Sequence, residues 1–153
     1  MINQCCKIKI NANYRAVYSY VSDLRNDKHW RDEVNITFLE GAQGLGNIAN
    51  ETSLLSTRVP EYMQKLECIM YTPDSEIIYQ TFPENHHYLM SKRKVVALSE
   101  NVTEFSYELL FNASLVKHGL GFRIPNFIVE MVTKRSMKKY MKVLKNRMEG
   151  NVL

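Results

Sequence analysis

The sequence predicts an α+β fold in which a curved, seven-stranded antiparallel sheet wraps around one long C-terminal helix. Two observations carry this prediction. From residue 34 onward, apolar residues alternate with polar ones over several short segments, as they do in strands that bury one face. From 125 to 147, apolar residues recur with helical spacing and no glycine or proline interrupts them after Pro125. Because an amphipathic helix of that length needs a surface to pack against, we expect the sheet to supply it.

The long helix has clear start and stop signals. Pro125 has the fixed φ that suits a first helical position, and Gly150 is the usual residue just past a helix. One side of the predicted helix carries Val129, Val132, Ser136, Met137, Tyr140, Val143 and Leu144. The opposite side carries Lys134, Arg135, Lys138, Lys139, Lys142 and Lys145. The sequence therefore predicts an apolar stripe against the sheet and a basic outer face.

The first elements are one strand and two short helices. Residues 5–11 alternate so that Cys6, Ile8 and Ile10 share one face. A helix is predicted over 14–23, where Asn11 or Asn13 can cap its first turn. A second, shorter helix is predicted over 26–31 and includes Trp30, the single tryptophan.

Six further strands are predicted over 34–40, 47–58, 61–71, 75–82, 88–99 and 103–114. Three glycines in residues 41–46 turn the chain after the second strand, and no Lys-Ser/Thr follows them to make a phosphate loop. The strand over 103–114 has the clearest pattern, with Phe105, Tyr107, Leu109, Phe111 and Ala113 on one face. No repeat or linker divides the chain, so residues 1–153 are expected to form one domain.

Composition excludes several classes of protein. No apolar run approaches the ~20 residues of a membrane span, and the first residues lack the apolar core of a signal peptide. We therefore expect a cytoplasmic protein. Its three cysteines are too few for a disulfide framework and stand at no metal-ligand spacing from His86, His87 or His118. We expect no metal and no cofactor.

The charge is unevenly distributed. Residues 120–149 contain eight Lys or Arg and two acids, whereas the whole chain has a net charge of +4. A solvated helix face explains this excess, and no aromatic stacking motif points to a nucleic-acid partner. Near the basic residues stand the apolar Phe127, Ile128 and Met131. That arrangement favours either reversible contact with an anionic membrane or a buried contact, including one in a homodimer; a monomer and a homodimer both remain open.

Several segments also resemble a known superfamily. They are the opening CKIKINANYRAVYSYVSDL, Trp30, Gly44-Leu-Gly46, the segment Ile69-Met-Tyr-Thr-Pro73-Asp74 before Ile78, and the basic C-terminal helix. Over its full length the chain resembles the START-like, helix-grip superfamily (SRPBCC), specifically its polyketide cyclase/dehydrase and lipid-transport branch. The resemblance implies a cavity under the long helix for a small lipid-, sterol-, aromatic- or polyketide-like molecule. It does not choose among carrier, sensor and enzyme.

The predicted cavity has a lining and a mouth. The expected ligand-binding residues are Tyr79, Phe105, Tyr107, Leu109, Phe111, Met137, Tyr140 and Leu144. The segment between the last strand and the long helix is expected to border the mouth through His118, Leu120, Phe122 and Phe127. The alternative for this segment is an ordinary connection packed on the core.

Few residues are suited to catalysis. On the 103–114 strand, Tyr107 is the only polar group on the cavity face, and Glu104 and Glu108 fall on the other face. No paired carboxylates can be recognised, and His86 and His87 are expected to be solvated in a turn. We therefore favour a binding protein for a small hydrophobic ligand. The alternatives are a cyclase- or dehydrase-type enzyme using Tyr107 or His118, and an interaction module acting through the basic helix.

Overall fold

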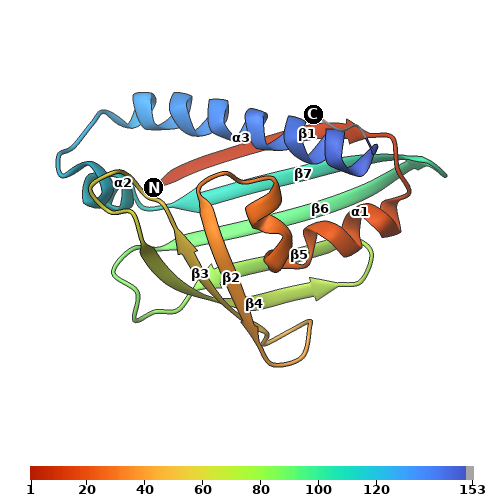
Figure 1. The fold of residues 1–153 in the computed structure, drawn as a ribbon, viewed down its shortest axis with the longest axis horizontal. Coiled ribbons are helices and arrows are strands. Elements are labelled where there is room, and N and C mark those ends of the chain that lie inside the picture. The colour runs from red at the N-terminus through yellow and green to blue at the C-terminus, as the bar shows by residue number, and fades with distance from the viewer. Residues whose placement is uncertain (151–153) are drawn as a thin grey trace.

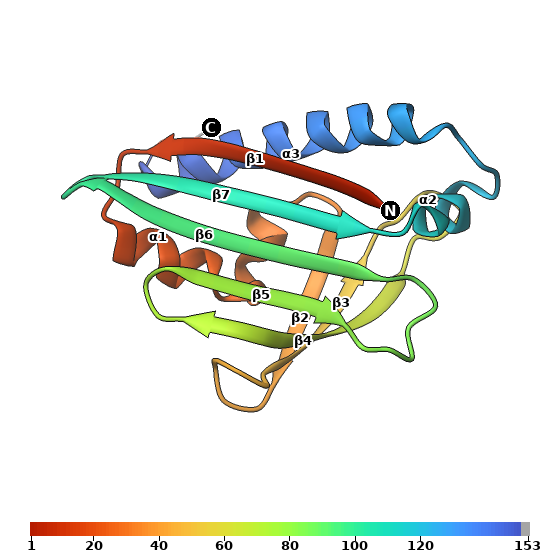
Figure 2. The same ribbon diagram turned by 180° about the vertical axis from the view of Figure 1, so that it is seen from behind.

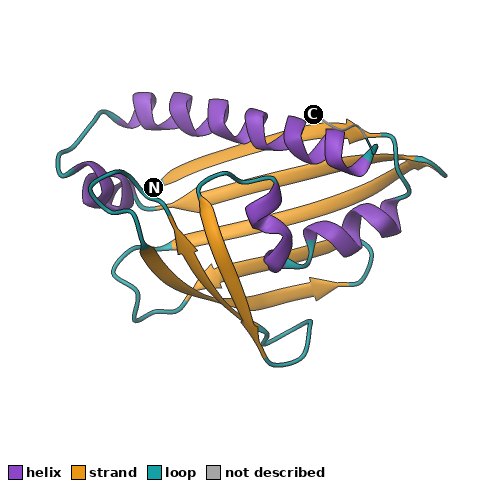
Figure 3. Ribbon diagram, in the orientation of Figure 1, coloured by secondary structure: helices purple, strands orange, loops and turns teal. Residues whose placement is uncertain are grey.

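The computed structural model describes residues 1–150, which fold into a seven-stranded sheet and four helices (Figures 1 and 3). The strands are β1 (Ile2–Ile10), β2 (Val34–Glu40), β3 (Ile48–Ser53), β4 (Tyr62–Thr72), β5 (Glu76–Thr81), β6 (Leu89–Ser99) and β7 (Val102–Phe111). The helices are α1 (Tyr14–Val21), the 3₁₀ helix η1 (Leu24–His29), α2 (Ala113–Leu120) and α3 (Asn126–Met148).

All neighbouring strands are antiparallel, in the order β1-β7-β6-β5-β4-β3-β2. β1 and β7 lie at one end of the sheet and α3 runs along them, as Figures 1 and 2 show from opposite sides. β2 and β3, at the other end, cross the direction of the remaining strands (Figure 1). The sheet therefore curls around the space under α3. The predicted fold class is confirmed.

Three irregularities accompany this curvature. The strand register shifts between Val34 and Ile36 in β2, between Cys68 and Met70 in β4, and near the β6–β7 turn. An extra residue on one strand bends it and increases the local right-handed twist. Two of the three shifts lie in the half of the sheet that turns toward α3.

The helix α2 corrects the sequence-based prediction. Residues 113–120 were expected to finish the last strand and to form a loop, but they form two helical turns. Ala113 and Leu115 continue the alternating pattern of β7, so the sequence of this segment resembles a strand. In the structure, Leu115 and Gly119 lie one helical turn apart and both are buried. Gly121 ends α2 in the left-handed conformation, with φ of 83°.

The apolar core is split into two clusters. The larger one joins β1, α1, β7 and α3, and Trp30 packs edge-on against Phe105 and Tyr107, with ring centroids 6.1 and 5.5 Å apart. The smaller one lies on β3, β4, β5 and η1 and consists of Leu24, Ala49, Leu66, Cys68, Ile77 and Tyr79. Charged side chains are buried in the same interior, and these lead to the candidate site.

Candidate functional site

A cavity of about 270 Å³ lies under α3, between this helix and the curled sheet. Its apolar wall includes Leu109 and Phe111 of β7, Leu115 of α2 and Met137 of α3. A second group of lining residues, here called the polar wall, consists of Arg31, Glu33, Glu51, Ser53 and Gln64. The cavity is therefore apolar on one side and strongly polar on the other.

The structure brings half of the expected ligand-binding residues to this cavity. Its lining includes Leu109, Phe111, Met137 and Tyr140. The other four residues are buried in the apolar clusters instead: Tyr79, Phe105, Tyr107 and Leu144. Tyr79 is held away from the cavity because its hydroxyl donates to Asn47 Oδ1 over 2.7 Å.

The expected mouth residues lie outside the cavity lining. They are His118, Leu120, Phe122 and Phe127, and all four side chains are exposed. The β3–β4 connection borders the cavity in their place, through Leu54 and Leu55. Leu55 also packs against Gly119 of α2, and Ser56 Oγ donates to the carbonyl oxygen of Gly119 over 2.5 Å. These contacts hold α2 against the β3–β4 connection, which forms the rim of the cavity.

Two histidines gather beside this rim. The rings of His87 and His118 have centroids 5.2 Å apart, and that of His118 is 5.8 Å from the ring of Tyr62. His87 Nδ1 lies 2.8 Å from Ser114 Oγ. Burial lowers the pKa of His87, and His118 and His86 lower it further. His87, expected to be solvated, is in fact partly buried against α2, because the β5–β6 connection folds onto that helix.

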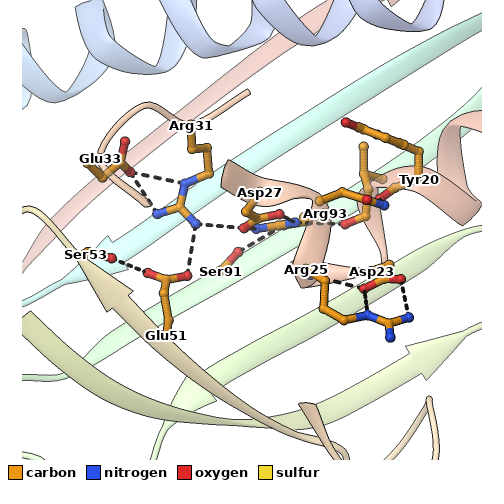
Figure 4. Close-up of polar contacts among 12 residues, drawn as sticks. Tyr20, Asp23, Arg25, Asp27, Arg31, Glu33, Glu51, Ser53, Ser91 and Arg93 are labelled. Carbon is orange, nitrogen blue, oxygen red and sulfur yellow. Dashed lines mark hydrogen bonds and ion pairs between the residues drawn. The ribbon is translucent and has the colours of Figure 1, made fainter. Parts of the chain in front are cut away.

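Behind the polar wall, a fully buried carboxylate joins two arginines (Figure 4). Arg93 Nη1 and Nη2 donate to the two oxygens of Asp27 over 2.7 and 2.5 Å. Arg31 Nη1 donates to Asp27 Oδ2 over 2.9 Å. Arg93 Nη1 also donates to the carbonyl oxygen of Val21 over 2.8 Å. Strand β6, helix α1 and helix η1 therefore meet at one ionic cluster.

Arg31 links this cluster to the cavity surface. Its Nε and Nη2 donate to Glu33 Oε1 over 3.1 and 2.9 Å, and its Nη1 lies 3.4 Å from Glu51 Oε2. Glu51 Oε1 in turn accepts from Ser53 Oγ over 2.9 Å and from Gln64 Nε2 over 3.0 Å. The polar wall is thus one connected hydrogen-bond network, and Figure 4 shows the part that joins Arg31, Glu33, Glu51 and Ser53.

Burial and charge oppose each other in their effect on the pKa of Arg31, and act in the same direction on the pKa of Tyr140. Burial disfavours the charged form of Arg31, but Tyr107 and the surrounding carboxylates outweigh it and raise its pKa. Burial raises the pKa of Tyr140, and the nearby carboxylate of Glu33 raises it further. We therefore expect Arg31 to be charged and the Tyr140 hydroxyl to be neutral at neutral pH.

Neighbouring carboxylates, which could not be recognised from the sequence, do occur in the structure. Glu33 and Glu51 both bind Arg31 beside the cavity, with Asp27 on its other side. Three separate elements supply these groups: η1, the residues before β2, and β3. One feature of the sequence could have indicated this site. Glu51 alternates in step with Ala49 and Ser53, so it points to the same buried face of β3 as they do.

The comparisons with solved structures agree with the fold. No protein-family model matches the sequence, and no curated protein matches it. A START superfamily protein from Mycobacterium smegmatis superposes with a TM-score of 0.75 at 12% identity, covering 98% of this chain and 99% of that one. The chain has the START-like, helix-grip fold.

Two further solved structures have the same fold. A protein from Thermus thermophilus superposes on this chain with a TM-score of 0.72 at 14% identity, and 99% of each chain is covered. The di-domain ARO/CYC StfQ of the steffimycin biosynthetic pathway gives a TM-score of 0.70 at 11% identity. That alignment covers 97% of this chain and 51% of StfQ. At these identities, the likeness defines the fold.

Two other features bear on function. None of the helices within residues 1–150 is both long and apolar enough to cross a membrane. In the same residues, no three His, Cys, Asp or Glu side chains are grouped so as to hold a metal ion.

Removing Arg93 should strongly destabilise the protein. In an Arg93→Met variant, Asp27 stays buried with Arg31 as its remaining charged partner, so we expect a loss of about 3 kcal/mol in the free energy of unfolding. The measurement is urea unfolding at neutral pH. A double variant, Asp27→Asn with Arg93→Met, should recover part of the loss because it also removes the buried charge. A loss below about 1 kcal/mol in Arg93→Met would contradict the importance of this cluster.

The stability should fall as the pH drops from about 7.5 to about 5. Because the pKa of His87 is lowered in the folded chain, the unfolded chain binds more protons below the ordinary histidine pKa of 6.5. His29, whose pKa is lowered mainly by burial, acts in the same direction. Between these two pH values, the melting temperature of His87→Asn should therefore fall by about 1 °C less than that of the wild type. Thermal unfolding at both pH values measures the difference.

The exposed neighbour His86 supplies the control, since His86→Asn keeps the packing of His87 against α2. Its melting temperature should follow the wild-type pH dependence more closely than that of His87→Asn does. Identical pH dependence in the wild type and in His87→Asn would show that His87 makes no such contribution.

Proposed function

We propose that this protein binds a small hydrophobic molecule in the cavity between α3 and the sheet. The cavity itself carries the proposal: about 270 Å³ of space lies inside a helix-grip fold, next to apolar side chains such as Leu109 and Met137. Ligand sites combine a mostly apolar surface with a few polar groups that orient the ligand. The polar wall supplies such groups.

The size of the cavity favours a compact ligand. A volume of about 270 Å³ is just below the ~300–1,000 Å³ of typical small-molecule pockets. A single aromatic system or one short chain suits this space better than a lipid with two chains. Among the lipid-, sterol-, aromatic- and polyketide-like classes, a ligand with one small aromatic system or one short chain is therefore preferred.

The ligand has a route into the cavity. Leu54 and Val132 both line it, yet their side chains are 44% and 50% exposed. They lie on the β3–β4 connection and on α3, so the opening is between these two segments. A hydrophobic molecule would meet apolar side chains from the surface inward.

An enzyme of cyclase or dehydrase type is the second candidate. The observation that favours it is the presence of Glu33 and Glu51 in the cavity lining, because positioned carboxylates can serve as general acid or base. Tyr107, the candidate from the sequence, is fully buried in the larger apolar cluster, and His118 is exposed. Loss of turnover in Glu51→Gln, with ligand binding retained, would support this candidate over simple binding.

Contact of the basic helix with an anionic membrane stays a prediction. Phe127 is 69% exposed near the start of α3, and the exposed Lys134 and Lys138 follow it on the same helix. This arrangement of apolar and cationic groups suits a lipid interface. Such contact would deliver a hydrophobic ligand close to the opening.

Filling the cavity should abolish binding. Ser136 of α3 lines the cavity, so Ser136→Phe places a ring inside it. We expect the affinity for the apolar dye 1-N-phenylnaphthylamine to fall at least about tenfold, because the dye and the new ring compete for one space. Dye fluorescence during titration measures the affinity.

The matched control is Ser106→Phe, which makes the same substitution on the outward face of β7 between the buried Phe105 and Tyr107. This variant should bind the dye as the wild type does, and circular dichroism should verify that both variants fold. The proposal fails if the wild type gives no saturable binding, or if Ser136→Phe binds as tightly as Ser106→Phe.

A further inference from the structure

The polar wall has hydrogen-bond acceptors that nothing satisfies. Glu33 Oε2 and Gln64 Oε1 are buried and have no hydrogen-bond partner. Both residues line the cavity, and Gln64 is only 8% exposed. Other buried, unpartnered polar atoms within residues 1–150 belong to Tyr20, Trp30, Thr37 and Tyr107, none of which lines the cavity. The unsatisfied groups at the cavity are thus both acceptors.

The chemistry of these two atoms is fixed by their neighbours. The amide nitrogen of Gln64 donates to Glu51 Oε1 over 3.0 Å, which leaves its carbonyl oxygen as the free atom. The other oxygen of Glu33 already accepts two hydrogen bonds from Arg31. The Tyr140 hydroxyl lies near enough to the Glu33 carboxylate for hydrogen bonding to help raise the pKa of Tyr140, but the geometry leaves Oε2 without a completed hydrogen bond. Both acceptors are therefore open to a donor from outside the chain, which at Glu33 would compete with the Tyr140 hydroxyl.

The formal charge of the surrounding cluster points the same way. Asp27, Glu33 and Glu51 contribute three negative charges, and Arg31 and Arg93 contribute two positive ones. Both guanidinium groups donate to partners inside the cluster. Lys139 of α3 is a further cation, but its Nζ lies 2.9 Å from Asp32 Oδ2 and is therefore already paired. The cluster keeps a formal charge of −1, which attracts a cation and repels an anion.

We propose that the cavity selects ligands that carry a cationic amine at one end of a small apolar body. The ammonium group donates to Glu33 Oε2 and Gln64 Oε1 and offsets the negative charge, while the apolar part lies against the wall that includes Leu109 and Met137. This inference rests on the proposed function, because it concerns the ligand of the same cavity.

Three probes with one chain length test the preference: octylamine, 1-octanol and octanoate. Each is used to displace 1-N-phenylnaphthylamine from the wild-type protein at about pH 7. We expect octylamine to bind at least about tenfold more tightly than 1-octanol, because only the amine pairs its charge with the carboxylate. Octanoate should bind most weakly, since its carboxylate would face unpaired acceptors of the same sign.

Glu33→Gln is the decisive variant, because it removes the charge and keeps the size of the side chain and one carbonyl oxygen for Arg31. The affinity for octylamine should fall about tenfold, whereas that for 1-octanol should change less than about threefold. Glu108→Gln is the matched control. Glu108 lies on the outward face of β7, opposite Lys92 of β6 in the strand register. The variant therefore removes one negative charge outside the cavity and should leave the preference for the amine unchanged.

The outcomes separate the two proposals. Equal affinities for the three probes, tighter binding of octanoate, or an unchanged preference in Glu33→Gln would overturn the amine inference while leaving the cavity as a binding site. If neither the dye nor any octyl compound binds, the proposed function fails and the amine inference fails with it.

Discussion

The burial of Asp27 between Arg31 and Arg93 is the constraint on which the rest of the interior depends. A carboxylate removed from water is tolerated only when cations and hydrogen bonds compensate for its lost hydration. Two guanidinium groups provide this compensation, one from β6 and one from the segment after η1. Because Arg31 also binds Glu33 and Glu51, the cluster holds η1 against both β6 and β3. The curled sheet and the short helices are thereby fixed around one point.

The cavity follows from this arrangement. Within the ionic cluster, Arg93 lies over the rings of Trp30 and Tyr107, 5.2 and 5.3 Å from their centroids. On one side, Trp30 fills the interior against β7. Farther along α3, toward α2, lies the cavity, whose lining includes Leu115 and Met137. The polar wall is the part of the cluster that faces this cavity.

The sequence was sufficient for the architecture and for part of the site. Period-two alternation and one uninterrupted amphipathic helix predict the sheet and α3, because both patterns are local. The same alternation concealed α2, since Ala113 and Leu115 extend the pattern of β7. Strand parity shows that Phe105 and Leu109 both point inward. It does not show that Trp30 packs against Phe105 or that Leu109 lines the cavity. The polar wall was missed because separate elements build it. Arg31 and Glu51 are 20 residues apart, and Asp27 and Arg93, which lie behind the wall, are 66 residues apart.

The account rests on a ligand-binding cavity under α3, and methyl NMR tests this most directly. The protein, labelled at its methyl groups, is titrated with 1-N-phenylnaphthylamine. We expect saturable shifts for the cavity-lining Leu109, Leu115 and Met137, whereas the outward-facing Val96 and Leu98 of β6 should not move. Shifts confined to exposed methyl groups such as those of Val96 and Leu98, with the lining residues unchanged, would contradict the account.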